Sequence, residues 1–215
     1  MPSFREILTL HAPVLLLDAA SARVQVGWLG ADRPPFWSDA TDEAGVALFR
    51  ALESLDVKPG DAGAFIFCSG PGSVLGVRTS AMAVRAWNAL QPRPTFSYHG
   101  LAIVAHTLRR PELTVVADAR RESWHAYRLG ESLRRVPTAE LAGPLATPEG
   151  FRTWSVLPRD VERVPYAMAD MLPHVRDQPD LLTPEDSPDA FLHEAPSYAT
   201  WTPQVHRAPG SRSDS

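Results

Sequence analysis

The chain has 215 residues, with 21 lysines and arginines against 25 aspartates and glutamates, and a formal net charge of -4. A hydrophobic share of 44% excludes a chain that is disordered throughout, and the negative charge argues against a strongly basic nucleic-acid-binding domain. A local basic patch remains compatible with that charge. The single cysteine, Cys68, excludes an internal disulfide and lies in an apolar run, which favours a buried, inert thiol. We expect a cytoplasmic protein without a membrane span, because no apolar segment approaches the ~18 residues that a span needs.

Short apolar runs mark the strands that we expect in the first part of the chain. Residues 1–13 resemble a loose leader. The continuous run at 14–17 predicts a buried strand ending at Asp18. Residues 24–28 alternate apolar with polar or small side chains, which predicts a second strand joined to the first as a hairpin, and 36–37 predict a short third strand.

A helical period follows over residues 39–56, with an apolar stripe formed by Val46, Phe49 and Leu52. Residues 64–68 form another continuous apolar run and predict a second buried strand. That strand leads into the glycine-rich loop 69–78. We expect a helix rich in small residues from there to about residue 90, closed by prolines.

The second half begins with the same alternation and then loses its periodicity. Residues 113–117 predict a strand ending on Asp118. Beyond residue 137 the prolines recur and the pattern weakens. The further elements expected here are strands at 95–98, 123–129 and 151–157, helices at 101–108 and 166–175, and a disordered tail at 208–215.

Two halves of related design are the simplest interpretation of this order. Each half opens with a buried strand that ends on an aspartate and is followed by another strand. The pattern predicts an α/β protein of two lobes, each a mixed sheet with helices. We place the first lobe at residues 1–98 and the second at 99–207.

The loop from Gly70 to Arg78 is the sharpest chemical signal in the sequence. It joins a buried strand to a helix, so helix N-terminal amides there are placed to hold an anion. It differs from the ATP-binding P-loop because no lysine follows its last glycine, and its glycine spacing differs from the dinucleotide fingerprint. The alternative is a tight strand-to-helix turn that needs glycine for its backbone angles.

Asp18 and Asp118 end corresponding strands and leave a similar choice open. Together they suggest a cleft between lobes that holds phosphate and magnesium, whereas singly each is typical of a turn former. No histidine pair is spaced three or four residues apart, so no helical metal site is predicted. The arginine pairs 109–110, 120–121 and 134–135 are suited either to phosphate binding or to surface solvation.

The helix at 77–90 combines small residues with larger apolar ones. Ser80, Ala81, Ala83 and Ala86 would let another helix approach closely, and Val84 and Trp87 are the kind of anchors that interfaces favour. This pattern predicts either packing within the same domain or an intermolecular contact, because the helix is small or apolar almost all round.

Four collinear motifs resemble the TsaB (YeaZ) family over about residues 14–207. Gly-Pro-Gly-Ser-Val-Leu-Gly-Val-Arg at 70–78 closely resembles the family's Gly-Pro-Gly-Ser-Phe-Thr-Gly-Val-Arg signature. Residues 15–21 resemble the opening strand and its Asp-Thr-Ser-Thr turn. Residues 116–121 resemble the later Ile-Asp-Ala-Arg motif, and 193–198 the closing Pro-x-Tyr segment.

The resemblance implies a two-lobed fold of the actin, sugar-kinase and Hsp70 type, which is ribonuclease H-like. It implies a non-catalytic scaffold in the synthesis of threonylcarbamoyladenosine (t6A) in tRNA. Such a scaffold binds a TsaD-like transferase, is joined by a TsaE-like ATPase, dimerises through the same helices and contacts tRNA indirectly. No catalytic residue, metal or firm cofactor is implied, and ATP or ADP would bind only at a partner interface.

The resemblance also assigns residues to two surfaces. A vestigial nucleotide site would comprise Asp18, Ser21, Gly70, Gly72, Ser73, Gly76 and Asp118. The partner interface would lie on the helices at 39–56 and 76–90, with Val46, Phe49, Val77, Ser80, Ala81, Ala83, Val84 and Trp87 as its residues.

The chain departs from the family where hydroxyls are usual. Ala19 and Ala20 stand in the first turn, and Val74 and Leu75 replace Phe-Thr. A loop with fewer hydroxyls is a poorer phosphate site, which fits a non-catalytic role. The alternatives are an autonomous nucleotide-hydrolysing enzyme of the same fold, a diverged paralogue with another partner, and a metallopeptidase, which the missing histidine pair disfavours.

Overall fold

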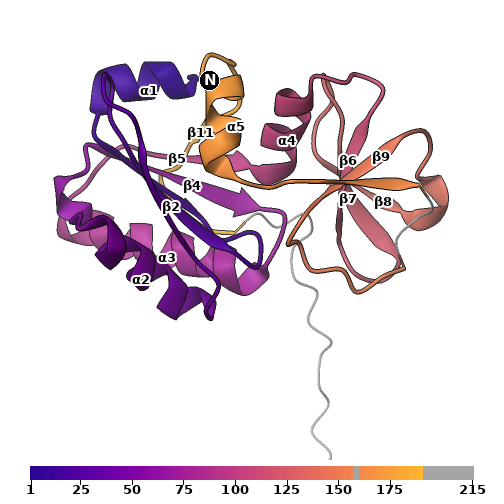
Figure 1. Ribbon diagram of the computed structural model, residues 1–215, viewed down its shortest axis with the longest axis horizontal. Helices are drawn as coiled ribbons and strands as arrows, with labels where there is room; N and C mark the ends of the chain where they lie inside the picture. The colour runs from indigo at the N-terminus through magenta and orange to yellow at the C-terminus, as the bar shows by residue number, and fades with distance from the viewer. Residues whose placement is uncertain (157–159, 191–215) are drawn as a thin grey trace, which may run out of the picture.

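The chain folds into two α/β lobes that lie side by side, each built on one mixed sheet (Figure 1). The computed structural model describes residues 1–156 and 160–190. The helices are α1 (Phe4–His11), α2 (Ala44–Leu55), α3 (Val74–Leu90), α4 (Gly100–Leu108) and α5 (Met168–Val175), with short 3-10 turns η1 (Pro59–Asp61) and η2 (Thr138–Glu140). The strands are β1 (Val14–Asp18), β2 (Val24–Leu29), β3 (Phe36–Ala40), β4 (Ala64–Gly70), β5 (Thr95–His99), β6 (Thr114–Asp118), β7 (Ser123–Tyr127), β8 (Arg134–Pro137), β9 (Leu145–Pro148), β10 (Val161–Val164) and β11 (Thr183–Pro184).

The two sheets repeat one topology, so the expected two-lobed α/β fold is confirmed. The first sheet has the order β11-β5-β4-β1-β2-β3, and the second has the order β10-β9-β6-β7-β8. In the first, β1 pairs parallel with β4 and antiparallel with β2. In the second, β6 pairs parallel with β9 and antiparallel with β7. Five strands therefore correspond one to one, and β11 is an extra edge strand on the first sheet.

The second lobe lacks the long helices that separate the corresponding strands of the first. Between β3 and β4 the chain forms α2, whereas between β8 and β9 it forms the 3-10 turn η2. Between β4 and β5 it forms α3, and between β9 and β10 the described residues contain no helix. The outer face of the second sheet is consequently covered by a small apolar cluster around the buried Trp124.

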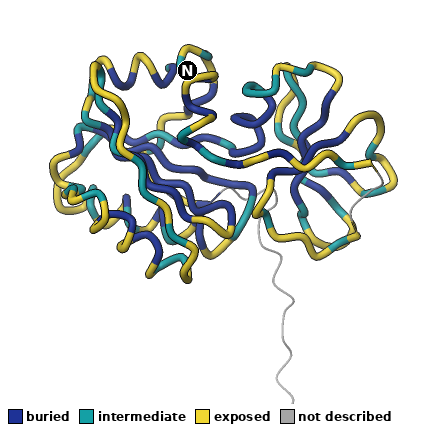
Figure 2. The backbone as a smooth tube through the Cα atoms, in the orientation of Figure 1, coloured by how far each residue is buried: buried dark blue, intermediate teal, exposed yellow. Residues whose placement is uncertain are grey.

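Helices cover both faces of the first sheet (Figures 1 and 2). Leu15 and Leu17 point from β1 toward α2 and α3, where they meet Leu48 and Val84. The alternate residue, Leu16, points to the opposite face, which α1, α4 and α5 cover. This two-sided burial explains why β1 and β4 have continuous apolar runs, since neither face of these strands meets water.

Helix α4 joins the lobes because it packs against strands of both sheets. Its residues from Gly100 to Ala105 are all buried. A β-carbon at Gly100 would lie 2.7 Å from the hydroxyl oxygen of Tyr166, so this helix fits against its neighbours only with glycine at its start. Helix α4 follows β5 and helix α5 follows β10, which are corresponding strands of the two sheets. The two helices pack on each other at the junction between the lobes.

Several expectations are wrong in detail. Residues 1–13 are not a loose leader, because Ser3 and Glu6 form a capping box on α1, whose Phe4, Ile7 and Leu8 are buried. The helix expected at 39–56 begins at Ala44, because residues 36–40 continue β3. No strand forms over 151–156, and residue 157 lies outside the described residues, as do the expected tail at 208–215 and the motif at 193–198. Strands β8 to β11 were not expected.

Candidate functional site

The glycine-rich loop connects β4 to α3 and packs on the turn that follows β1. A β-carbon on Gly72 would lie 2.4 Å from the carbonyl oxygen of Ala20, and one on Gly76 would lie 2.1 Å from that of Ala19. The amide of Ser73 donates a hydrogen bond to the Ala20 carbonyl at 2.7 Å. Both glycines are therefore required for a contact of backbone on backbone, which accounts for them without a bound anion.

The two serines of the candidate site bind locally. The Ser73 hydroxyl caps α3 by accepting a bond from the amide of Gly76 at 3.3 Å. The Ser21 hydroxyl donates to the carbonyl of Arg23 at 2.8 Å and accepts from the amide of the same residue at 3.1 Å. Gly70 ends β4 with φ of 118°, a conformation that favours glycine. These contacts support the tight strand-to-helix turn, the second of the two alternatives that the sequence left open.

Asp18 is fully buried and its carboxylate is occupied by donors from the chain itself. Its Oδ2 accepts hydrogen bonds from the phenols of Tyr98 at 2.6 Å and Tyr166 at 2.5 Å, and its Oδ1 accepts the amide of Ala20 at 3.0 Å. Tyr98 lies on β5 and Tyr166 directly before α5, so one carboxylate ties three distant segments together. Asp18 thus acts as a buried hydrogen-bond acceptor and also as the turn former of the hairpin.

Burial sets the protonation behaviour of this cluster. Burial raises the pKa of Asp18 above its ordinary value, and the bonds from Tyr166 and Tyr98 offset part of that effect. Burial and the nearby Asp18 charge raise the pKa of both phenols and of the Cys68 thiol, whose sulfur lies 4.0 Å from the Tyr166 hydroxyl. Cys68 is therefore the buried, inert thiol that its apolar context predicted.

Asp118 occupies the corresponding position in the second sheet and makes the corresponding turn. Its Oδ1 accepts the amide of Arg120 at 2.6 Å, two residues on, as Asp18 does with Ala20. Its Oδ2 accepts the amides of Trp154 at 2.7 Å and Ser155 at 2.5 Å. Partial burial acts to raise the pKa of Asp118, but the amide bonds outweigh it and the pKa lies below its ordinary value. Each aspartate is thus occupied by donors from the chain itself.

The expected interface residues divide into exposed and buried groups. On α2, Val46 and Phe49 are about half exposed. On α3, Val77, Ser80, Ala81 and Val84 are buried inside the first lobe and face the sheet, while Ala83 and Trp87 are half-buried beside α2. Leu75 and Met82, which were not among the expected interface residues, are 59% and 57% exposed on α3. Both lie opposite the buried stripe of that helix, and helical spacing in the sequence predicts this exposure.

Metal-ligating side chains do not gather within residues 1–156 and 160–190, where no group of three or more histidine, cysteine, aspartate or glutamate residues is placed to hold an ion. Over the same residues, no helix has the length and apolar character needed to cross a membrane.

Comparisons with known proteins identify the fold. No family model matches the sequence, and no curated protein matches it. The structure resembles YeaZ from Pseudomonas aeruginosa with a TM-score of 0.56 and 21% identity, over 75% of this chain and 89% of that one. It also resembles a protein described as uncharacterized, with similarity to peptidase YeaZ from Pseudomonas aeruginosa, with a TM-score of 0.54 and 20% identity, over 75% and 88% of the chains. The resemblance inferred from the four motifs is therefore confirmed at the level of the fold, and the chain has the two-lobed α/β fold of YeaZ.

Proposed function

We propose that the chain is a TsaB (YeaZ) protein and serves as a non-catalytic scaffold in t6A synthesis, where it binds and activates a TsaD-like transferase. The fold and the collinear motifs support the family. The observation that carries the scaffold role is an apolar surface on α2 and α3. We define this α2–α3 face as the exposed Val46, Phe49, Leu75 and Met82 together with the half-buried Ala83 and Trp87.

The α2–α3 face has more apolar surface than the fold requires. Both helices already bury a stripe against the first sheet, with Leu48 and Leu52 on α2 and Val77 and Val84 on α3. Phe49 also lines a surface pocket at the C-terminal end of α2, where the segment 56–59 and Trp87 of α3 form the other walls, and this pocket offers a recess for a partner side chain. Exposed apolar side chains near such a recess are typical of protein–protein interfaces.

The candidate nucleotide site supports a scaffold over an independent enzyme. Nucleotide hydrolysis in this fold would need a carboxylate open to magnesium and loop amides open to phosphate. In this chain both oxygens of Asp18 accept bonds from protein donors, and the Ala20 carbonyl lies against Gly72 where a phosphate would approach. ATP or ADP, if used, would bind at the interface with the transferase.

We also propose an order of assembly for the partners. A TsaD-like transferase would occupy the α2–α3 face, a second copy of this chain would compete for it, and a TsaE-like ATPase would join the assembled pair. The cytoplasm is the compartment that this pathway requires. A diverged paralogue would use the same face for another protein, so partner identity has to be measured directly.

Size-exclusion chromatography with TsaD from the same organism tests the proposal. The wild-type chain should co-elute with TsaD and should not hydrolyse ATP alone. Phe49→Asp and Met82→Asp should each abolish co-elution, because each places a charge in a contact that excludes water. Leu10→Asp is the matched control, since Leu10 is 74% exposed on α1 across the sheet. Unchanged co-elution of both variants, or ATP turnover by the isolated chain that Asp18→Asn removes, would contradict the proposal.

A further inference from the structure

The turn after β6 has an unusual backbone. Arg120, Arg121 and Glu122 have φ values of 63°, 51° and 54°, so three consecutive residues with side chains adopt the left-handed conformation. Each such residue is disfavoured by contact of its β-carbon with the backbone. The surrounding structure must therefore hold this turn in place.

Hydrogen bonds hold the turn on several sides. The Asp118 carboxylate binds the amide of Arg120 and also the amides of Trp154 and Ser155, which lie in the loop after β9. The carbonyl of Glu122 accepts bonds from the amide and the hydroxyl of Thr138, at 2.8 Å and 2.9 Å. The turn, the loop around Trp154 and the start of η2 thus form one braced unit.

This unit keeps a tryptophan in contact with water. The Trp154 side chain is about half exposed, and the Arg120 guanidinium carbon lies 4.4 Å from its ring centroid. The Asp118 carboxylate accepts hydrogen bonds from the backbone amides of Trp154 and Ser155. It also accepts one from the amide of Arg120, so the backbones of both contacting residues are bound to the same side chain. The backbone that carries the indole is therefore fixed, and a cation lies against the ring.

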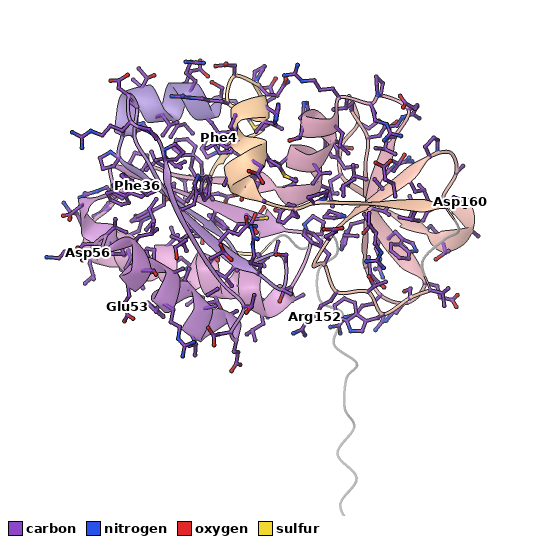
Figure 3. The ribbon with its side chains drawn as sticks, in the orientation of Figure 1. Phe4, Phe36, Glu53, Asp56, Arg152 and Asp160 are labelled. Atoms are coloured by element: carbon purple, nitrogen blue, oxygen red, sulfur yellow. The ribbon has the colours of Figure 1, made fainter. Side chains whose placement is uncertain are left out.

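The exposed indole borders a surface pocket. Its walls are Arg121, Glu122, Thr138, Ala139, Trp154, Ser155 and Val156. Arg135 adds positive charge beneath the turn, where its Nη2 donates to the carbonyls of Ala119 and Arg120 at 3.2 Å and 3.4 Å. Arg152, two residues before Trp154, lies at the lower edge of the second lobe in Figure 3. Arg121 therefore lines the pocket, and Arg120 lies against its indole. The acidic residues here are Glu122, which also lines the pocket, and Asp118, whose charge is bound by amides.

We propose that this Trp154 pocket binds single-stranded RNA, with one nucleobase stacked on the indole and an adjacent phosphate held by Arg121. A flat ring next to an anion is the ligand that an arginine-flanked indole recognises, and aromatic side chains with basic neighbours bind single strands in this way. The choice of RNA as the source of the base rests on the proposed function, whereas the site rests on the contacts above. The chain would then contact tRNA directly and contribute to its recognition beside the transferase.

Fluorescence anisotropy of the purified chain tests the inference, with a labelled single-stranded RNA of about eight nucleotides at low salt, a length within the range of single-strand sites. Trp154→Ala should weaken binding at least about fivefold, as loss of one base stack does, and Trp154→Phe should retain most of the affinity. Arg121→Gln should reduce the slope of log K against log salt by about 0.7, the value for one phosphate of a single strand.

Matched controls come from the first lobe. Phe36→Ala removes an aromatic side chain that is 60% exposed on β3, and Arg85→Gln removes an exposed arginine on α3, so both should bind RNA as the wild type does. Circular dichroism and the urea midpoint should show that every variant is folded. Wild-type affinity in Trp154→Ala would overturn the inference, and so would equal competition by a mononucleotide, which would assign the pocket to a free nucleotide.

The two proposals fail separately. Loss of RNA binding in Trp154→Ala with TsaD co-elution intact would establish the Trp154 pocket independently of the α2–α3 face. RNA binding that no pocket variant affects would remove this inference and leave the scaffold proposal unchanged. Failure to bind TsaD, with Trp154-dependent RNA binding retained, would remove the scaffold proposal alone.

Discussion

Tyr166 donates its phenolic hydrogen to Asp18 at 2.5 Å, across 148 positions of the sequence. The same Asp18 oxygen also accepts a hydrogen bond from the phenol of Tyr98. One buried atom therefore joins the end of β1, the end of β5 and the segment before α5. This carboxylate is therefore central to the stability of the first lobe.

Asp18→Ala should lower the free energy of unfolding by about 2–6 kcal/mol, because it leaves two buried phenols without their acceptor at about 1–3 kcal/mol each. Urea denaturation followed by circular dichroism measures the change. Asp32→Ala, at an exposed residue, is the control and should change stability by less than about 0.5 kcal/mol. A similar small effect at Asp18 would show that the tyrosine bonds contribute little.

The pH dependence of stability should carry the signature of Asp18. Burial raises its pKa in the folded chain, so the folded state holds the proton more tightly than the unfolded state. The stabilisation from this group is complete below the unfolded pKa, which is about 4, and is lost as pH rises through the folded pKa. Asp18→Asn stays neutral, so its stability relative to wild type should improve as pH rises from about 4 to about 8. Parallel stability curves for the two proteins would contradict a raised pKa.

Gly76→Ala should destabilise the chain by about 3 kcal/mol, because the new β-carbon would lie 2.1 Å from the Ala19 carbonyl oxygen and the backbone would have to move. Gly45→Ala on α2 has open space around its β-carbon and should stabilise by about 0.5–1 kcal/mol. Thermal and urea unfolding of the pair separate the two effects. If Gly76→Ala gained stability as Gly45→Ala does, the loop would not pack on the β1–β2 turn as described.

Phe4→Ala should cost about 3–5 kcal/mol, because the Phe4 side chain of α1 is fully buried and its ring centroid lies 6.1 Å from that of Tyr98. Leu10→Ala on the same helix should change stability by less than about 0.5 kcal/mol, since Leu10 faces water. Equal unfolding free energies for the two variants would mean that α1 does not complete the core.

The parts of the fold that the sequence predicts are those whose neighbours are local or whose burial is two-sided. The strands β1, β4 and β6 stand out as continuous apolar runs because nearly all of their side chains are buried on both faces. Helix α1 was missed although Ser3 and Glu6 have the spacing of a capping box, because eight residues contain too few turns for a periodic pattern. Strands β8 and β10 have four residues each and include exposed charged side chains, which hide the alternation.

The candidate site was harder to predict because its partners are remote. The glycine loop and both aspartates are recognisable as motifs, but their contacts come from distant segments. Nothing local to Asp18 indicates that Tyr98 and Tyr166 will bind it, and nothing near Asp118 indicates Trp154. Similarly, the small residues of α3 are compatible with core or interface, and only the position of the sheet assigns Ser80 and Ala81 to the core.

The position of α5 and β11 has a consequence for how the protein is made. The first sheet begins near residue 14, yet α5, which covers one of its faces, and β11, which extends its edge, follow the whole of the second sheet in the chain. A ribosome must therefore synthesise the chain to about residue 175 before the part of this face that α5 covers is sealed. During that interval the apolar side chains that pack with α5 on this face stay partly uncovered, and such transiently exposed surface is prone to aggregation.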